Sequence, residues 1–183
     1  MTDPVIVEVT VAAPAKAVWR ALTDPTELHR WHGWDYDGLA DEIRIIYVEA
    51  PTISEDELVL DTGNGRFALE PQGETTVVRV TRAAPEGQTS WDGIYDEINE
   101  GWLTFVQQLR YYLERHPGED RRSFHVDRRI AVPEGTVWFR SANQTGVLLG
   151  EHGLCVVGQS GTVVSTYGLD AAEERSVRER LGV

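Results

Sequence analysis

The stretch "DGIYDEINEGWLTFVQQLRYYLERHPG", residues 92–118, decides how this chain can fold. Its large apolar side chains recur at steps of three and four, which places them on one side of an α-helix; they are Ile94, Ile98, Trp102, Phe105, Leu109 and Tyr112. Pro117 and Gly118 end the pattern. At about 1.5 Å per residue such a helix runs for roughly 35 Å, about the width of a small domain. A stripe of that length needs an extended apolar surface to pack against.

The start of the chain predicts one strand followed by two short helices. "PVIVEVTVAAP", residues 4–14, alternates apolar and polar side chains as a half-buried strand does. "AKAVWRALT", residues 15–23, has the spacing of a short amphipathic helix. Asp24 is expected to cap a second helix, and Glu27, three residues later, completes the sequence pattern of a capping box.

Four segments between Gly33 and Arg82 read as strands separated by the turn signals "TGNG" and "PQG". They are "IRIIYVE" (residues 43–49), "DELVLD" (56–61), "RFALE" (66–70) and "TTVVRVTR" (75–82). An antiparallel sheet has one apolar face to cover, and the long helix carries a matching stripe. Residues 1–118 are therefore predicted to form an α+β domain in which a curved antiparallel sheet wraps around the long helix.

Residues 119–183 predict a C-terminal extension. "GLCVVGQSGTVVSTYG", residues 153–168, reads as a β-hairpin, and Asp170 with Glu173 caps a final short helix. An isolated hairpin is marginally stable in water, so the extension should dock on the first domain or form a homodimer contact. "VPEGTVW" (132–138) echoes "APAKAVW" (13–19), and both an unrelated extension and a truncated repeat of the first domain remain open.

Charge and composition exclude several classes of protein. A net charge of −13 makes nucleic acid an improbable partner, since phosphate binding rests on clustered Lys and Arg. No apolar run is long enough to span a membrane, and the N-terminus does not resemble a signal peptide, so we expect a cytoplasmic protein. The excess acid is either a solvated face or a docking surface for a basic partner; its densest group is Asp35, Asp37, Asp41, Glu42, Glu49, Glu55, Asp56, Glu57 and Asp61.

The segment "VAAPAKAVWRALTDPTELHRWHGW", residues 11–34, resembles the opening of the SRPBCC (START-like, helix-grip) superfamily, and is most similar to bacterial homologues of the activator of the heat-shock-protein-90 ATPase. "EGWLTFVQQLRYYLERH", residues 100–116, resembles the closing helix of that family. The resemblance implies a helix-grip fold with a ligand cavity between sheet and helix. The family includes lipid and hormone binders, polyketide cyclases and aromatases, and chaperone cofactors, so the fold alone selects no function.

Few side chains suggest chemistry. His29 and His32, with Asp35 after them, have the spacing of metal ligands or of acid–base groups, yet histidine is also favourable at a helix end. The other histidines are scattered, so neither a metal nor another cofactor is expected. Cys155 lies in an apolar strand pattern, where a thiol is inert.

The aromatic side chains are more informative. Trp34 and Trp91 are flanked by Gly and Asp in predicted loops and are the best candidates for a pocket rim. Aromatic residues in helix stripes most often fill a core, and the alternative is contact with a ligand. The predicted ligand-binding residues are Trp31, Trp34, Tyr36, Trp91, Trp102, Phe105, Leu109 and Tyr112.

Three functional hypotheses follow. The first is non-catalytic binding of an apolar or amphipathic small molecule between the long helix and the sheet. The second, implied by the resemblance, is a surface module that docks on a chaperone ATPase. The third is a cyclase-type enzyme, with His29, His32 or Asp35 as its acid–base group.

Overall fold

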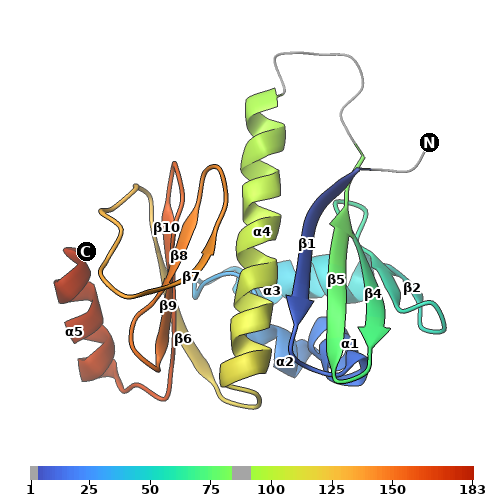
Figure 1. The fold of residues 1–183 in the computed structure, drawn as a ribbon, viewed down its shortest axis with the longest axis horizontal. Coiled ribbons are helices and arrows are strands. Elements are labelled where there is room, and N and C mark those ends of the chain that lie inside the picture. The colour runs from blue at the N-terminus through green and yellow to red at the C-terminus, as the bar shows by residue number, and fades with distance from the viewer. Residues whose placement is uncertain (1–3, 84–91) are drawn as a thin grey trace. The chain divides into compact units, whose positions relative to one another are not determined.

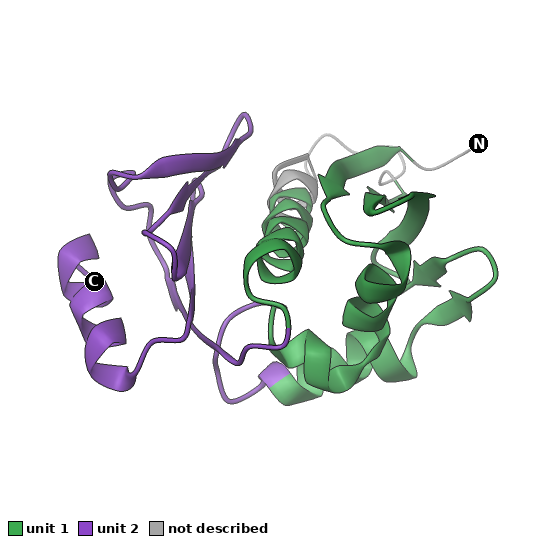
Figure 2. Cartoon of the chain, turned by 60° about the horizontal axis from the view of Figure 1, so that its bottom comes forward, with its two compact units in different colours: residues 1–32, 40–117 green, residues 33–39, 118–183 purple. Residues whose placement is uncertain are grey.

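The computed structural model describes residues 4–83 and 92–183. The chain divides into two compact units (Figure 2). Unit 1 consists of residues 1–32 and 40–117, and unit 2 of residues 33–39 and 118–183. Within the described ranges, each unit contains one five-stranded antiparallel sheet and a helix that follows the last strand of that sheet. No helix in these ranges is both long enough and apolar enough to cross a bilayer.

Unit 1 begins with a strand and two short helices, continues through four more strands, and closes with the long helix (Figure 1). Its elements are β1 (Val5–Val11), α1 (Ala15–Thr23), α2 (Pro25–His29), α3 (Leu39–Ile43, whose first residue belongs to unit 2), η1 (Arg44–Glu49), β2 (Thr52–Ser54), β3 (Val59–Asp61), β4 (Arg66–Gln72), β5 (Thr75–Thr81) and α4 (Asp92–Arg115). The sheet order is β1-β5-β4-β3-β2. This arrangement confirms the predicted fold class, an α+β fold with an antiparallel sheet and a long closing helix.

The core of unit 1 lies between this sheet and α4, which packs along β1. Val7 and Val11 of β1 are buried, as the alternation predicts. The end of α4 is tied to the turn after β1, because the Ala12 backbone N–H donates to Glu114 Oε1 at 2.8 Å. Among the described side chains of the helix, the buried stripe includes Trp102, whereas the predicted member Ile98 is 38% exposed; the side chain of Ile94 lies outside the described part.

The predicted strand at residues 43–49 is wrong, since these residues end α3 and form the π-helix η1. The buried side chains are Ile43 and Tyr47, four residues apart as on a helix, while Ile45 and Val48 are exposed. Arg44 forms ion pairs backward to Asp41 and forward to Glu49, contacts that a helical backbone brings within reach. The β-branched residues of this segment fit both the two-residue period of a strand and the 3.6-residue period of a helix, and tertiary packing decides for the helix.

The next predicted strand, residues 56–61, is shorter than expected. Residues 55–58 form a turn in which Leu58 has φ of 52°, and β3 begins only at Val59. The unpredicted strand β2, Thr52–Ser54, pairs with β3 and forms the edge of the sheet. The segments predicted at residues 66–70 and 75–82 are confirmed as β4 and β5.

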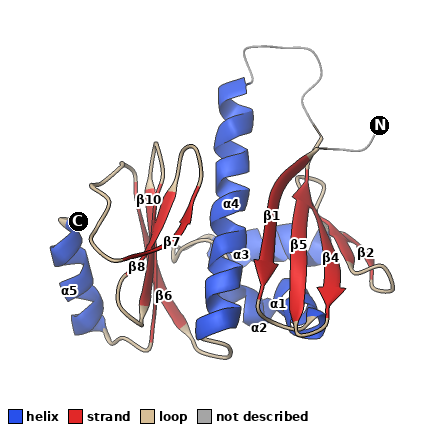
Figure 3. Ribbon diagram, viewed as in Figure 1, coloured by secondary structure: helices blue, strands red, loops and turns tan. Residues whose placement is uncertain are grey.

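Unit 2 contains a complete sheet rather than a hairpin alone (Figure 3). Its elements are β6 (Arg121–Val126), β7 (Thr136–Arg140), β8 (Thr145–Leu148), β9 (Gly153–Val157), β10 (Thr162–Tyr167) and α5 (Ala171–Leu181). The predicted hairpin is confirmed as β9 and β10. The predicted helix is confirmed as α5, which carries a complete capping box between Asp170 and Glu173. Strands β7 and β8 were not predicted.

The two units share one topology. In unit 2 the strand order is β6-β10-β9-β8-β7, so the first strand again pairs with the last and the remaining strands follow in reverse order. The difference lies after the first strand, where unit 1 inserts its short helices and unit 2 has the helix-free connection 127–135. The sequence echo does not mark equivalent structure, since Trp19 lies in α1 and Trp138 in β7. A shortened repeat therefore stays a proposal, supported by the shared strand order.

A short segment from the first half of the chain completes unit 2. The Asp35 backbone N–H donates to Ser123 Oγ at 3.0 Å, and the Ser123 N–H donates to Asp35 Oδ2 at 2.7 Å. Arg121 Nη1 donates to the Gly33 carbonyl at 3.0 Å. Because β6 is the edge strand of its sheet, residues 33–39 cover an edge that would otherwise be unpaired.

Candidate functional site

Six rings, one of them that of the fully buried His32, gather in the core of unit 1. They come from the turn after α2, from η1, from β4 and from α4, and we name them the His32 cluster: Trp31, His32, Tyr47, Phe67, Trp102 and Phe105. The helical turn after α2 places the histidine, because the His32 backbone N–H donates to the Leu28 carbonyl at 2.9 Å. The π-helix η1 presents Tyr47 to the same point.

Both ring nitrogens of His32 have ionisable neighbours. Nε2 lies 2.9 Å from Glu42 Oε1, and Nδ1 lies 3.1 Å from the Tyr47 hydroxyl. A carboxylate can only accept, so a neutral His32 donates from Nε2 to Glu42 and accepts at Nδ1 from Tyr47. The result is a hydrogen-bonded chain from Tyr47 through His32 to Glu42.

Burial controls the charge state at the inner end of this chain. Desolvation raises the pKa of Tyr47 well above its ordinary value, and the nearby charge of Glu42 raises it further. Tyr47 is therefore a neutral hydroxyl at physiological pH. At the outer end, the Glu42 side chain is 29% exposed and links the buried histidine to solvent.

The surrounding rings form apolar walls with one partly exposed member. Trp31 meets the His32 ring edge-on at 5.5 Å between centroids, and Phe105 lies at 4.4 Å. Trp102 packs edge-on against Phe67 at 5.3 Å and Phe105 at 5.9 Å. Phe105 of α4 is the one side chain of the cluster that is partly exposed, and the other five are buried.

A second buried polar group of unit 1 has a structural role. Glu27 was predicted to complete a capping box, but Asp24 alone caps α2, by accepting from the Thr26 N–H. The Glu27 carboxylate turns inward and accepts from Arg20, Arg30 and Tyr112. A buried carboxylate that accepts from two guanidinium groups and one hydroxyl is satisfied. It joins α1, α2 and α4.

The predicted ligand-binding residues fall into separate places. Trp31, Trp102 and Phe105 belong to the His32 cluster, whereas Leu109 and Tyr112 are buried further along α4. The remaining described members lie in unit 2, where the Trp34 ring stacks on His125 at 4.4 Å and Tyr36 is 46% exposed; Trp91 lies outside the described residues.

The three candidate acid–base residues are separated as well. His29 is exposed and His32 is buried, although they are only three positions apart. Asp35 bonds to the edge of the unit 2 sheet. Sequence reasoning missed Tyr47, which it placed in a strand, and assigned Glu42 only to the acidic group that was interpreted as either a solvated face or a docking surface. The four-residue spacing of Ile43 and Tyr47 was the signal that could have identified a helix there.

The residues of the predicted acidic group are divided between the two units. Asp35 and Asp37 belong to unit 2, while Asp41 and Glu49 of unit 1 pair with Arg44. Docking of a basic partner stays a prediction. Across the described residues, no three His, Cys, Asp or Glu side chains are grouped as a metal site would require.

No family model matches the sequence, and no curated protein matches it. Among solved structures, DynU16 from the dynemicin biosynthetic locus is 17% identical, with a TM-score of 0.41 over 95% of this chain and 91% of that chain. The di-domain ARO/CYC BexL from the BE-7585A biosynthetic pathway is 10% identical, with a TM-score of 0.42 over 99% of this chain and 93% of that one. The di-domain ARO/CYC StfQ from the steffimycin biosynthetic pathway is 12% identical, with a TM-score of 0.39 over 96% and 92%. At this level of similarity, residue roles in those proteins do not carry over to this chain.

Proposed function

We propose that unit 1 binds a small molecule with an aromatic or conjugated carbonyl group at the His32 cluster and moves a proton on it. The observation that carries this proposal is the chain Tyr47–His32–Glu42 set among aromatic rings. Perturbed ionisable groups in apolar surroundings are the groups that enzymes use for proton transfer. The rings supply flat apolar walls for a conjugated ligand.

The proton steps can be written for a carbon acid next to a carbonyl group. The Tyr47 oxygen takes the proton from the ligand carbon while the hydroxyl proton of Tyr47 passes to His32 Nδ1. The electron pair of the broken C–H bond becomes the enolate of the ligand. The imidazolium that forms on His32 lies next to the Glu42 carboxylate, which stabilises its charge as the buried acid does in a catalytic triad. The transferred proton exchanges with solvent through the chain that ends at the partly exposed Glu42, and reversal of the steps then returns a solvent-derived proton to the carbon and restores the resting chain.

Access to this site runs past Phe105. The His32 ring is fully buried, and the partly exposed Phe105 ring lies against it. Among the described residues, Phe105 is the one ring of the cluster that is partly exposed, so we infer that a ligand reaches Tyr47 when Phe105 moves aside. Phe105→Ala should therefore speed ligand entry, whereas the loss of Tyr47 should slow the proton transfer itself.

Hydrogen–deuterium exchange of the methyl protons of acetophenone in D₂O, followed by NMR, tests this proposal. The wild type should accelerate exchange over buffer, and Tyr47→Phe should reduce that acceleration by about 10²-fold, the lower end for general acid–base catalysis. Tyr112→Phe is the matched control, because Tyr112 is also buried and bonded to a carboxylate but lies outside the His32 chain. Equal effects of the two variants, or no acceleration by the wild type, would contradict catalysis.

Non-catalytic binding is the second candidate, and the complete burial of the His32 ring favours it. A buried histidine with partners for both nitrogens can serve packing alone. Saturable binding of acetophenone without exchange, weakened by Phe67→Ala, would support this alternative. It would place the ligand at the cluster and leave the Tyr47–His32–Glu42 chain as a structural element.

A further inference from the structure

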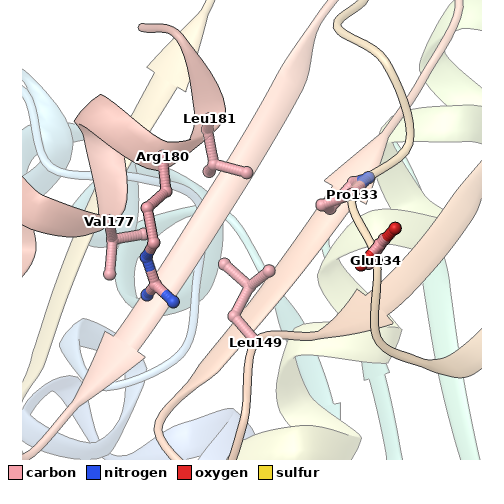
Figure 4. Close-up of a pocket in the computed structure, with 6 residues that line it drawn as sticks. All are labelled: Pro133, Glu134, Leu149, Val177, Arg180 and Leu181. Carbon is pink, nitrogen blue, oxygen red and sulfur yellow. The ribbon is translucent and has the colours of Figure 1, made fainter.

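Unit 2 contains a pocket of its own, with a volume of about 470 Å³ (Figure 4). It is lined by Pro133, Glu134, Leu149, Val177, Arg180 and Leu181, all of which belong to unit 2. Two of these residues come from the connection between β6 and β7, one follows β8, and three come from α5. The volume falls within the range of roughly 300–1,000 Å³ that is typical of small-molecule sites.

Unit 2 has no helices after its first strand, unlike unit 1. In unit 1 the connection after the first strand folds into α1 and α2, and α1 packs near α4. In unit 2 the corresponding residues 127–135 contain no helix, and Pro133 and Glu134 of this connection line the pocket together with α5. The floor is the core of the unit, where Val177 packs with Phe124 and the partly buried Leu149.

The pocket combines apolar walls with one available cation. Arg178 is engaged, because its Nε donates to Glu174 at 2.9 Å and its guanidinium lies 3.8 Å over the Phe124 ring. Arg180 is exposed, and among the described residues no ion pair to it is present. Figure 4 shows its side chain extending from α5 beside Val177, with Glu134 on the opposite side of the group of lining residues.

We propose that this pocket binds a small apolar molecule that carries one carboxylate. The side chains of Leu149, Val177 and Leu181 contact the apolar body, and Arg180 holds the carboxylate through the paired donors of its guanidinium. Glu134 repels a second negative charge, so the pocket selects monoacids over diacids. The site lies in unit 2 and is independent of the function proposed for the His32 cluster.

Calorimetric titration of the full chain with decanoic acid and with decanol tests this assignment. Arg180→Gln should weaken decanoate binding by about tenfold, the lower end for a charge-assisted hydrogen bond, and leave decanol binding unchanged. Glu134→Gln should strengthen decanoate binding. Arg175→Gln is the matched control, since Arg175 is an exposed arginine of the same helix that does not line the pocket.

Three results would overturn the proposal. One is the absence of decanoate binding by the wild type. Another is an equal loss for Arg175→Gln and Arg180→Gln, which would indicate a general charge effect. The third is a decanoate affinity that changes in Tyr47→Phe but not in Arg180→Gln, which would place the ligand in unit 1. Because Arg180 is exposed, its replacement leaves the core of unit 2 intact, and far-UV circular dichroism verifies the fold.

Discussion

Addition of one methyl group at Gly65 tests the packing of the His32 cluster. Gly65 is a buried residue in the turn before β4, and the Trp102 ring lies directly over it. A Cβ at this position would stand 2.9 Å from two ring atoms of Trp102, closer than real Cβ contacts allow. Neither side can easily retreat, because Phe67 and Phe105 hold the ring edge-on. The backbone of Gly65 is fixed by its hydrogen bonds with Thr62.

The magnitude follows from two opposing terms. Overpacking of a close-packed core costs about 1–3 kcal/mol. Replacement of glycine by alanine restricts the unfolded chain and offsets about 0.4–1 kcal/mol of that cost. The middle values of the two ranges, about 2 and about 0.7 kcal/mol, leave a loss of about 1.3 kcal/mol in the free energy of unfolding for Gly65→Ala. With a urea m-value of about 2 kcal/mol/M, the midpoint falls by about 0.6 M.

Gly101→Ala is the same chemical change as Gly65→Ala, but it should raise the free energy of unfolding. Gly101 lies inside α4, and a Cβ there meets nothing within 4 Å. Glycine in a helix interior is about 0.5–1 kcal/mol worse than alanine, so this variant should be more stable than the wild type. Urea unfolding followed by tryptophan emission and far-UV circular dichroism measures both variants. A Gly65→Ala midpoint at or above that of the wild type would refute the close packing of Trp102 on the turn.

Three further outcomes are expected. Asp35→Ala should lower the unfolding free energy of unit 2 by about 1–2 kcal/mol, because the buried Ser123 N–H loses its acceptor, while the exposed Asp37→Ala should have little effect in the same urea titration; equal effects would contradict the role of Asp35. Burial raises the pKa of the Cys155 thiol to about 12. A thiol reagent at pH 8 should therefore modify Cys155 only at the rate at which the protein unfolds, and rapid modification in native buffer would contradict this. Hydrogen bonds from the first-turn amides of α5 lower the pKa of Asp170. Asp170→Ala should therefore lower the melting temperature most above the ordinary Asp pKa of about 3.9, and the difference from the wild type should shrink as pH falls through the lowered pKa. A difference that is constant with pH would exclude this linkage.

The spacing of apolar residues predicted an element correctly where that spacing fits either a strand or a helix but not both. The alternation in β1 is long enough to exclude a helix, and the stripe of α4 is long enough to exclude a strand. Residues 43–49 are short and β-branched, and only their contacts decide between strand and helix. That one ambiguity also concealed the site, because Tyr47 reaches His32 from a π-helix and would point elsewhere in a strand.

Unit 2 shows a second limit of sequence reasoning. Strand β8 contains Gly146, and glycine in a sequence indicates a turn more often than a strand. In the structure the Phe139 ring of β7 packs over this glycine, where a side chain would clash. The glycine is therefore needed for a cross-strand contact that is not visible along the chain. Strand β7 is an edge strand with little burial, so its alternation is weak.

The crossing of residues 33–39 into unit 2 means that no single cut separates the two halves of this chain. A protein that ends at residue 117 would keep this segment but lose Ser123 and Arg121, its partners on β6. A protein that begins at residue 118 would expose the edge of β6, which is a template for pairing with other chains. Because the paired residues lie 88 positions apart, this edge closes only after most of the chain has been synthesised. Dissection of this protein into independent halves therefore requires that residues 33–39 be moved from their place between the two segments of unit 1 and joined to residues 118–183 by a new linker.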